Sequence, residues 1–116
     1  PSFYSRKSGF TSPLRLDKPK AIAALLTAKW NIGLNGSVLI ANPVPAEFEI
    51  AATEMEVHIQ QALNAAKEKN IIGKNVTPFL LQYIAEHTKG ESLEANIALI
   101  KHNAKVGAEV AVEYCF

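Results

Sequence analysis

Apolar residues recur at helical spacing from the first third of the chain onwards. A first helix is predicted to begin at Asp17, which can cap it, with Pro19 in its first turn and Gly33 at its end. A second helix is predicted behind the capping box at 53–56 (TEME), and its pattern fades at Lys69. The inward positions of these two helices are Ile22, Leu25, Leu26 and Trp30, then Met55, Ile59, Ala62, Leu63 and Ala66.

Two further helices are predicted in the second half of the chain. Thr77 and Pro78 begin the third helix, with Phe79, Leu80, Tyr83 and Ile84 facing inward, and Gly90 breaks it. Ser92 is predicted to cap the last helix. The buried face of that helix is predicted to be Leu93, Ile97, Ile100, Ala104, Ala108 and Ala111.

One short apolar run predicts a strand and not a helix. Residues 38–41 (VLIA) lie between Gly36 and Pro43 and predict a strand buried on both faces, as in a parallel sheet. A lone strand cannot satisfy its backbone N–H and C=O groups in a core. Its partners are therefore either unrecognised strands in 1–16 and 106–116, or polypeptide outside this chain. The first of these ranges reads as irregular, docking through its aromatic residues, and the alanines of the second favour helix.

Composition narrows the class of protein. The 116 residues suffice for one domain at most, and 48% hydrophobic with 20% charged residues is typical of a folded chain. The net charge is +1 and the basic residues form no stripe, so a nucleic-acid partner is not expected. No apolar run is long enough for a bilayer, and the single Cys115 excludes an internal disulfide, so we expect a cytoplasmic protein with no membrane partner.

Polar residues at the ends and faces of these elements are the candidates for chemistry. Asn42 follows the predicted strand, where open α/β sheets bind ligands. Its amide either orients a polar substrate or bonds its own backbone to turn the chain. Asn96 and Asn103 are seven residues apart on one helix face, which indicates a cleft wall or a polar contact with another element.

Other groups have simpler structural explanations. The glutamates at 47, 49, 54 and 56 fit a solvated helix start better than paired catalytic carboxylates. The histidines at 58, 87 and 102 match no metal-ligand spacing. The loop at 73–78 (GKNVTP) can hold an anion at a helix N-terminus, but it lacks the glycines of a phosphate loop.

Three longer motifs carry a resemblance. VLIANPVP at 38–45, GKNVTPFLL at 73–81 and SLEANIALIKHNA at 92–104 resemble the pseudouridine-5'-phosphate glycosidases, also called indigoidine synthase A-like proteins. The order and spacing of these motifs match that family over nearly the whole chain. Their combination is far more specific than any one of them.

The resemblance implies a reaction that this chain does not complete alone. The family cleaves the C–C glycosidic bond of pseudouridine 5'-phosphate reversibly to uracil and ribose 5-phosphate, through a lysine imine at C1' with a glutamate moving protons. It implies Mn²⁺ as cofactor, a homotrimer, and α/β/α subunits. The catalytic groups and metal ligands belong to the family's N-terminal and middle regions, which this chain lacks.

Two residues of this chain are carried over as substrate-binding. Asn96 aligns with a family residue that contacts the ribose or base. Asn42, in the ANPVP loop, is carried over on position alone. The family usually has two adjacent asparagines where this chain has His102 before Asn103. His102 either tunes a contact with the substrate or a neighbouring subunit, or is a surface substitution, and we favour the second interpretation.

The sequence therefore predicts an α/β fold class, with residues 1–116 as the C-terminal segment of a single glycosidase domain. This piece of an α/β/α sandwich is expected to be mostly helical with one interior strand. Pro1 at the start, with Met55 as the only methionine, is consistent with part of a longer polypeptide. The expected partners are the small-molecule substrate and the remainder of the polypeptide, and the chain alone is expected to be inactive. The alternative is a non-catalytic helical interaction module derived from the enzyme.

Overall fold

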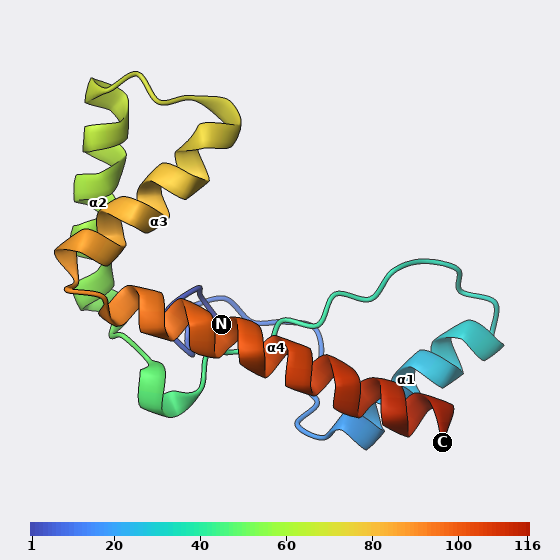
Figure 1. Ribbon diagram of the computed structural model, residues 1–116. Helices are drawn as coiled ribbons and strands as arrows, with labels where there is room; N and C mark the ends of the chain where they lie inside the picture. The colour runs from blue at the N-terminus through green and yellow to red at the C-terminus, as the bar shows by residue number, and fades with distance from the viewer.

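The computed structural model describes residues 1–116 and contains helices but no strand (Figure 1). Helices α2 and α3 pack side by side at one end, and α1 packs along the long α4 at the other. No helix has both the length and the apolar character that crossing a bilayer requires. The elements are α1 (Pro19–Asn31), η1 (Ala46–Phe48), α2 (Ala52–Glu68), η2 (Gly73–Asn75), α3 (Val76–His87) and α4 (Glu91–Cys115).

The four predicted helices are confirmed, but their starts differ from the sequence patterns. Helix α2 begins at Ala52, so Thr53 lies inside its first turn and makes no capping hydrogen bond. Ser92 lies inside α4, whose N-cap is Gly90 in the left-handed region at φ 89°. The predicted capping roles of the Thr53 and Ser92 hydroxyls were therefore wrong. For Ser92 the reason is tertiary, because its side chain is buried at 2% exposure among other polar groups.

The predicted strand at 38–41 is not formed in this structure. Residues 35–44 take part in no backbone–backbone hydrogen bond, and the Leu39 side chain is 94% exposed. A strand needs a neighbour to complete its ladder, and the chain offers none. Residues 1–16 are irregular and 106–115 belong to α4, so neither range holds an overlooked strand.

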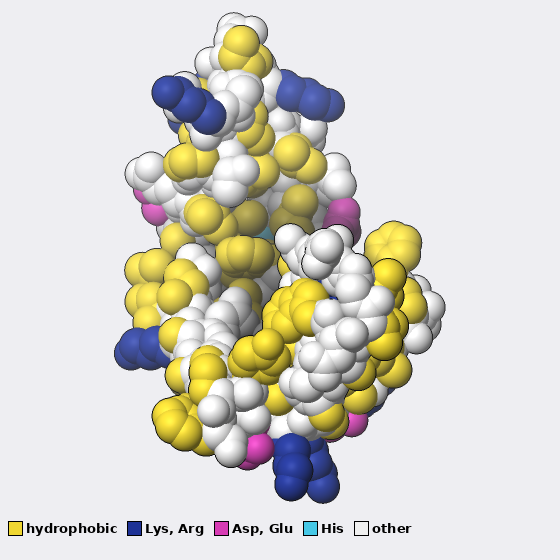
Figure 2. Space-filling view, turned by 90° about the vertical axis from the view of Figure 1, so that its right-hand side faces the viewer, with side chains coloured by type: hydrophobic (Ala, Val, Ile, Leu, Met, Phe, Trp, Pro, Cys, Tyr) yellow, Lys and Arg dark blue, Asp and Glu magenta, His cyan; other side chains and the backbone are white.

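Helix α1 covers one side of α4 near its C-terminal end. Ile22 and Ala23 of α1 are buried, as is Val110 of α4. The Trp30 and Tyr114 rings meet edge to face, with centroids 5.5 Å apart. The end of the molecule formed by these two helices still shows broad hydrophobic areas, with the charged side chains mainly at the edges (Figure 2).

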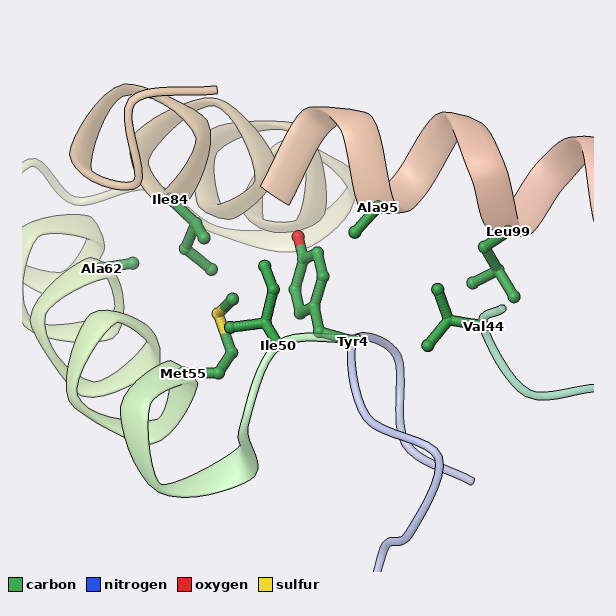
Figure 3. Close-up of a cluster of buried hydrophobic side chains, with 8 residues drawn as sticks. All are labelled: Tyr4, Val44, Ile50, Met55, Ala62, Ile84, Ala95 and Leu99. Atoms are coloured by element: carbon green, nitrogen blue, oxygen red, sulfur yellow. The ribbon is translucent and has the colours of Figure 1, made fainter. Parts of the chain in front are cut away.

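The main core lies where α2, α3 and the start of α4 meet, and Tyr4 of the N-terminal segment inserts into it (Figure 3). The Tyr4 backbone carbonyl accepts a hydrogen bond from Ile50 N at 2.9 Å, and Ser5 Oγ donates to Ile50 O at 2.6 Å. Arg6 Nη1 donates to Val44 O at 2.8 Å. The core residues are Tyr4, Val44, Ile50, Met55, Ala62, Ile84, Ala95 and Leu99.

The Tyr4 hydroxyl ends in a small buried polar group. Burial raises the pKa of Tyr4 above its ordinary value of 10.0, and a hydrogen bond with the Ser92 side chain opposes that rise. Thr88 Oγ1 lies 2.9 Å from Ser92 Oγ and 2.8 Å from Ile84 O. Thr88 thus connects the Ser92 side chain to a carbonyl of the preceding helical turn, within the same buried polar group as the Tyr4 hydroxyl.

The buried side of α4 is not the predicted one. Its buried residues are Ser92, Ala95, Leu99 and Val110. The predicted stripe lies about 100° around the helix, because it is displaced by one residue along the sequence. Leu93, Ile97 and Ile100 are 51%, 45% and 60% exposed. The prediction was wrong for this chain, since α4 carries two apolar stripes and only one is covered here.

Folding should become less favourable at alkaline pH because of Tyr4. Its pKa is higher in the folded state than in the unfolded state, so above about pH 10 the unfolded chain loses this proton first and stability falls. We expect Tyr4→Phe to reduce the fall in urea midpoint between pH 9 and 11. A fall of the same size in both proteins would show that other groups cause it.

Gly90 and Gly107 should respond oppositely to alanine. Gly90→Ala places a Cβ at φ 89° and should cost about 1 kcal/mol. Gly107 lies within α4 with nothing within 4 Å of an added Cβ, so Gly107→Ala should add about 0.5–1 kcal/mol. Urea midpoints at constant slope measure both changes. Shifts in the same direction would contradict this account.

Candidate functional site

Asn42 joins the extended segment to helix α4. Its Nδ2 donates to Asn103 Oδ1 at 3.0 Å and lies 3.0 Å from His102 Nδ1. A carboxamide nitrogen carries two hydrogens, so both contacts can form together. We refer to Asn42, His102 and Asn103 as the Asn42 cluster. It connects positions about 60 residues apart along the chain.

The cluster depends on the protonation of the His102 ring. His102 Nδ1 lies 3.0 Å from Asn42 Nδ2 and 3.2 Å from Pro43 O. A neutral ring with its hydrogen on Nε2 accepts from Asn42 at Nδ1. A hydrogen on Nδ1 instead donates to Pro43 O and faces the Asn42 amide with a second donor. The observed Asn42 contact therefore requires the first tautomer.

The structure decides between the two interpretations of Asn42 only in part. Its side chain makes no hydrogen bond to its own local backbone, so the predicted turn role is absent. The amide nitrogen is committed to α4, whereas Oδ1 accepts no hydrogen bond from the protein. A substrate contact by Asn42 through Oδ1 stays a prediction.

Asn96 is separate from the Asn42 cluster. It is half-buried on α4, on the same side of the helix as Asn103 and about 10 Å from it along the axis. No protein hydrogen bond engages the Asn96 side chain. A half-buried carboxamide without a partner is available to a ligand or to another part of the protein.

A hollow of about 410 Å³ lies along α4 and is lined by His102 among others, and no sequence pattern predicted it. Lys101 and Lys105 line it together with Glu94, and η1 closes it through Phe48. Asn42 and Asn96 do not line it. A second hollow of about 730 Å³ runs along the polar side of α2, where the Glu56 carboxylate accepts from Gln60 Nε2 at 2.8 Å. Neither hollow unites the predicted site residues.

The remaining candidate residues lie away from the Asn42 cluster. No group of three or more His, Cys, Asp and Glu side chains is placed to hold a metal ion. His87 stacks on Tyr83, with ring centroids 3.9 Å apart. The four glutamates at 47, 49, 54 and 56 are exposed, and the loop at 73–75 is a 3-10 turn leading into α3. The structure thus brings together Asn42, His102 and Asn103, and leaves the half-buried Asn96 side chain without a protein hydrogen bond.

The acceptor at position 102 can be tested by two substitutions. Asparagine places an oxygen close to where histidine places Nδ1, so His102→Asn should keep the Asn42 contact. His102→Ala should lower the free energy of unfolding by about 0.5–1 kcal/mol, measured by urea denaturation. If His102→Ala costs as much in an Asn42→Ala background, the two side chains are not coupled.

Solved structures share this fold. An indigoidine synthase A-like protein of Thermotoga maritima superposes with a TM-score of 0.83 at 36% identity, over 97% of this chain and 37% of that one. The prealnumycin C-glycosynthase AlnA, solved in complex with ribulose 5-phosphate, superposes with a TM-score of 0.80. AlnA is 23% identical over 96% of this chain and 36% of that chain, a likeness of fold alone.

Several glycosidase sequences are more similar to this chain than these solved structures are. The pseudouridine-5'-phosphate glycosidase of Deinococcus radiodurans is 54% identical over 114 residues, which is 98% of this chain and 36% of that protein. The glycosidase of Geobacillus kaustophilus is 51% identical over 113 residues, or 97% of this chain and 38% of that protein. The chain therefore spans little more than a third of these relatives, in their C-terminal part. The family model described as indigoidine synthase A like protein matches residues 1–113, and the chain belongs to this family.

Proposed function

We propose that this chain forms the C-terminal part of a pseudouridine-5'-phosphate glycosidase. The observation that carries the proposal is 54% identity to the Deinococcus radiodurans enzyme over 98% of the chain. An identity of 54% over nearly the whole chain supports the same fold for the matching part of that enzyme. The complete protein then cleaves the C–C bond between uracil and ribose 5-phosphate, reversibly.

The role of this chain in that reaction is to bind and orient substrate. C–C cleavage needs an electron sink, which a lysine imine at C1' provides, and we assign that lysine to polypeptide outside these 116 residues. Asn96 offers both a donor and an acceptor from a half-buried position with no protein partner. Ribose hydroxyls and the uracil amide are groups that such a side chain can hydrogen-bond.

Asn42 contributes less directly under this proposal. Its amide nitrogen holds residues 42–43 against α4. We assign its Oδ1, which accepts no protein hydrogen bond, to a donor group of the substrate. His102 supports that placement by accepting from Asn42. His102 is then a positioning residue, in contrast to the surface substitution expected from the sequence.

The proposal extends to cofactor, assembly and location. Mn²⁺ is assigned to ligands outside this chain, because the His, Cys, Asp and Glu side chains described here form no metal-binding group. No step of the reaction is assigned to the metal through these residues. The complete protein is proposed to be a cytoplasmic homotrimer with α/β/α subunits, in which residues 1–116 are one segment of a single domain.

A chimera tests the function directly. The C-terminal third of the Deinococcus radiodurans glycosidase is replaced by these 116 residues, and release of uracil from pseudouridine 5'-phosphate is followed by absorbance. We expect turnover by the chimera and none by the 116-residue chain alone. A folded chimera without turnover would contradict the proposal, as would uracil release by the isolated chain.

Asn96→Ala in the chimera tests the binding role. We expect kcat/KM to fall at least about tenfold, equivalent to about 1.4 kcal/mol of lost transition-state stabilisation, with an unchanged melting temperature. The matched control is Asn64→Ala, an exposed asparagine on α2 that should leave both quantities unchanged. Unchanged kinetics with a lowered melting temperature would make Asn96 structural.

A further inference from the structure

The hollow of about 410 Å³ along α4 has an apolar side and a cationic side. Its apolar side contains Pro45, Phe48 and Ile97. Its cationic side contains Lys101, His102 and Lys105, which lie further along the helix. We refer to this site as the α4 hollow. Small-molecule sites typically occupy roughly 300–1,000 Å³ and combine apolar walls with a few polar groups, and the α4 hollow fits that description.

The two lysines of the α4 hollow carry charges that the protein hardly compensates. Lys101 and Lys105 are one helical turn apart, where like charges repel each other. Lys101 forms no ion pair, and Lys105 forms only a 3.9 Å contact with Glu109 at an exposed position, where such pairs contribute little. Glu94 also lines the hollow, but it lies about 10 Å from Lys101 along the axis and pairs with neither lysine. The hollow therefore offers positive charge to an anion.

His102 adds a directional hydrogen-bond donor to these charges. Its Nδ1 lies 3.0 Å from Asn42 Nδ2, and accepting from that amide requires the ring hydrogen to be on Nε2. Only the Nε2–H group is then left for a ligand in the hollow that His102 lines. A phosphate group suits this set of donors, because its terminal oxygens can accept from the imidazole and from the flexible lysine ammonium groups.

The apolar side of the hollow indicates a larger ligand than inorganic phosphate. Phe48 is 39% exposed and Ile97 is 45% exposed, so both side chains present apolar surface to water. A planar ring bound against Phe48 removes that surface from water and stacks on the phenyl ring. A ligand that carries both a phosphate and a planar ring matches both sides of the hollow.

We propose that the α4 hollow binds a phosphate monoester that carries a planar ring. The phosphate lies between Lys101 and Lys105 and accepts from His102 Nε2–H, while the ring packs against Phe48. An apolar protein surface is a poorer occupant, because Glu94 and both lysines would lose water without gaining partners. The same chemistry is found in the substrate of the proposed function and in other nucleotides and aryl phosphates.

Calorimetric titration of the chimera with phenyl phosphate tests the site. We expect the double variant Lys101→Ala, Lys105→Ala to bind it at least about tenfold more weakly, since two charge-assisted contacts are lost. The matched control is Lys20→Ala, Lys67→Ala, which removes the same charge at two exposed positions outside the hollow and should leave the affinity unchanged. An unchanged affinity in the first double variant would overturn the site, as would an equal loss in the control.

The planar ring is tested by comparing phenyl phosphate with inorganic phosphate. We expect Phe48→Ala to weaken the binding of phenyl phosphate several-fold and to leave that of inorganic phosphate unchanged. Phenyl phosphate that binds no more tightly than inorganic phosphate to the unsubstituted chimera would overturn the proposed ligand class.

Competition with ribose 5-phosphate separates the two sources of the ligand. Displacement of phenyl phosphate by saturating ribose 5-phosphate would support the proposal with the substrate of the reaction as the source. Binding of both together would support it with another ring-bearing phosphate monoester as the source. These titrations do not depend on turnover, so the proposed site can fail while the proposed function holds, and the reverse.

Discussion

The fold of this chain depends on the anchoring of its N-terminal segment between two distant parts of the sequence. Tyr4 fills the centre of the main core, while its carbonyl and the Ser5 hydroxyl hold both backbone groups of Ile50. Arg6 fixes the carbonyl of Val44 from the same short segment. These bonds hold the end of the irregular stretch between α1 and α2, in which residues 35–44 make no backbone–backbone hydrogen bond.

Helix α4 carries two apolar stripes on different sides. One stripe closes the core with Ala95 and Leu99 and receives α1 near Val110, whereas the neighbouring stripe remains open. This arrangement explains how a chain with 48% hydrophobic residues can bury only 15 of its 116 residues. The second stripe and the extended segment at 38–41 are exposed in this chain. The chain spans little more than a third of the length of its glycosidase relatives.

The candidate site residues also divide into one that is hydrogen-bonded within the chain and one that is not. Asn42 is occupied within the chain, by His102 and Asn103 of α4, and keeps one oxygen free. Asn96 lies two turns away with its carboxamide unengaged. Under the proposed function, one wall of the substrate site would contain the preorganised Asn42 and the unengaged Asn96. Hydrogen bonds made before substrate arrives reduce the ordering cost of binding.

The sequence by itself determined the four helices and the family, because helical periodicity and long motifs are local properties of the chain. It also indicated that a strand at 38–41 needs partner strands, either in 1–16 and 106–116 or outside this chain, and the structure excluded the first alternative. Tertiary structure decided the helix caps, the buried side of α4 and the contact of Asn42 with His102. Ser92 and Asn42 show why: each has several local partners available, and only packing against residues far along the chain selects one of them. Likewise α4 has two apolar stripes, and periodicity alone cannot tell which one its own chain covers.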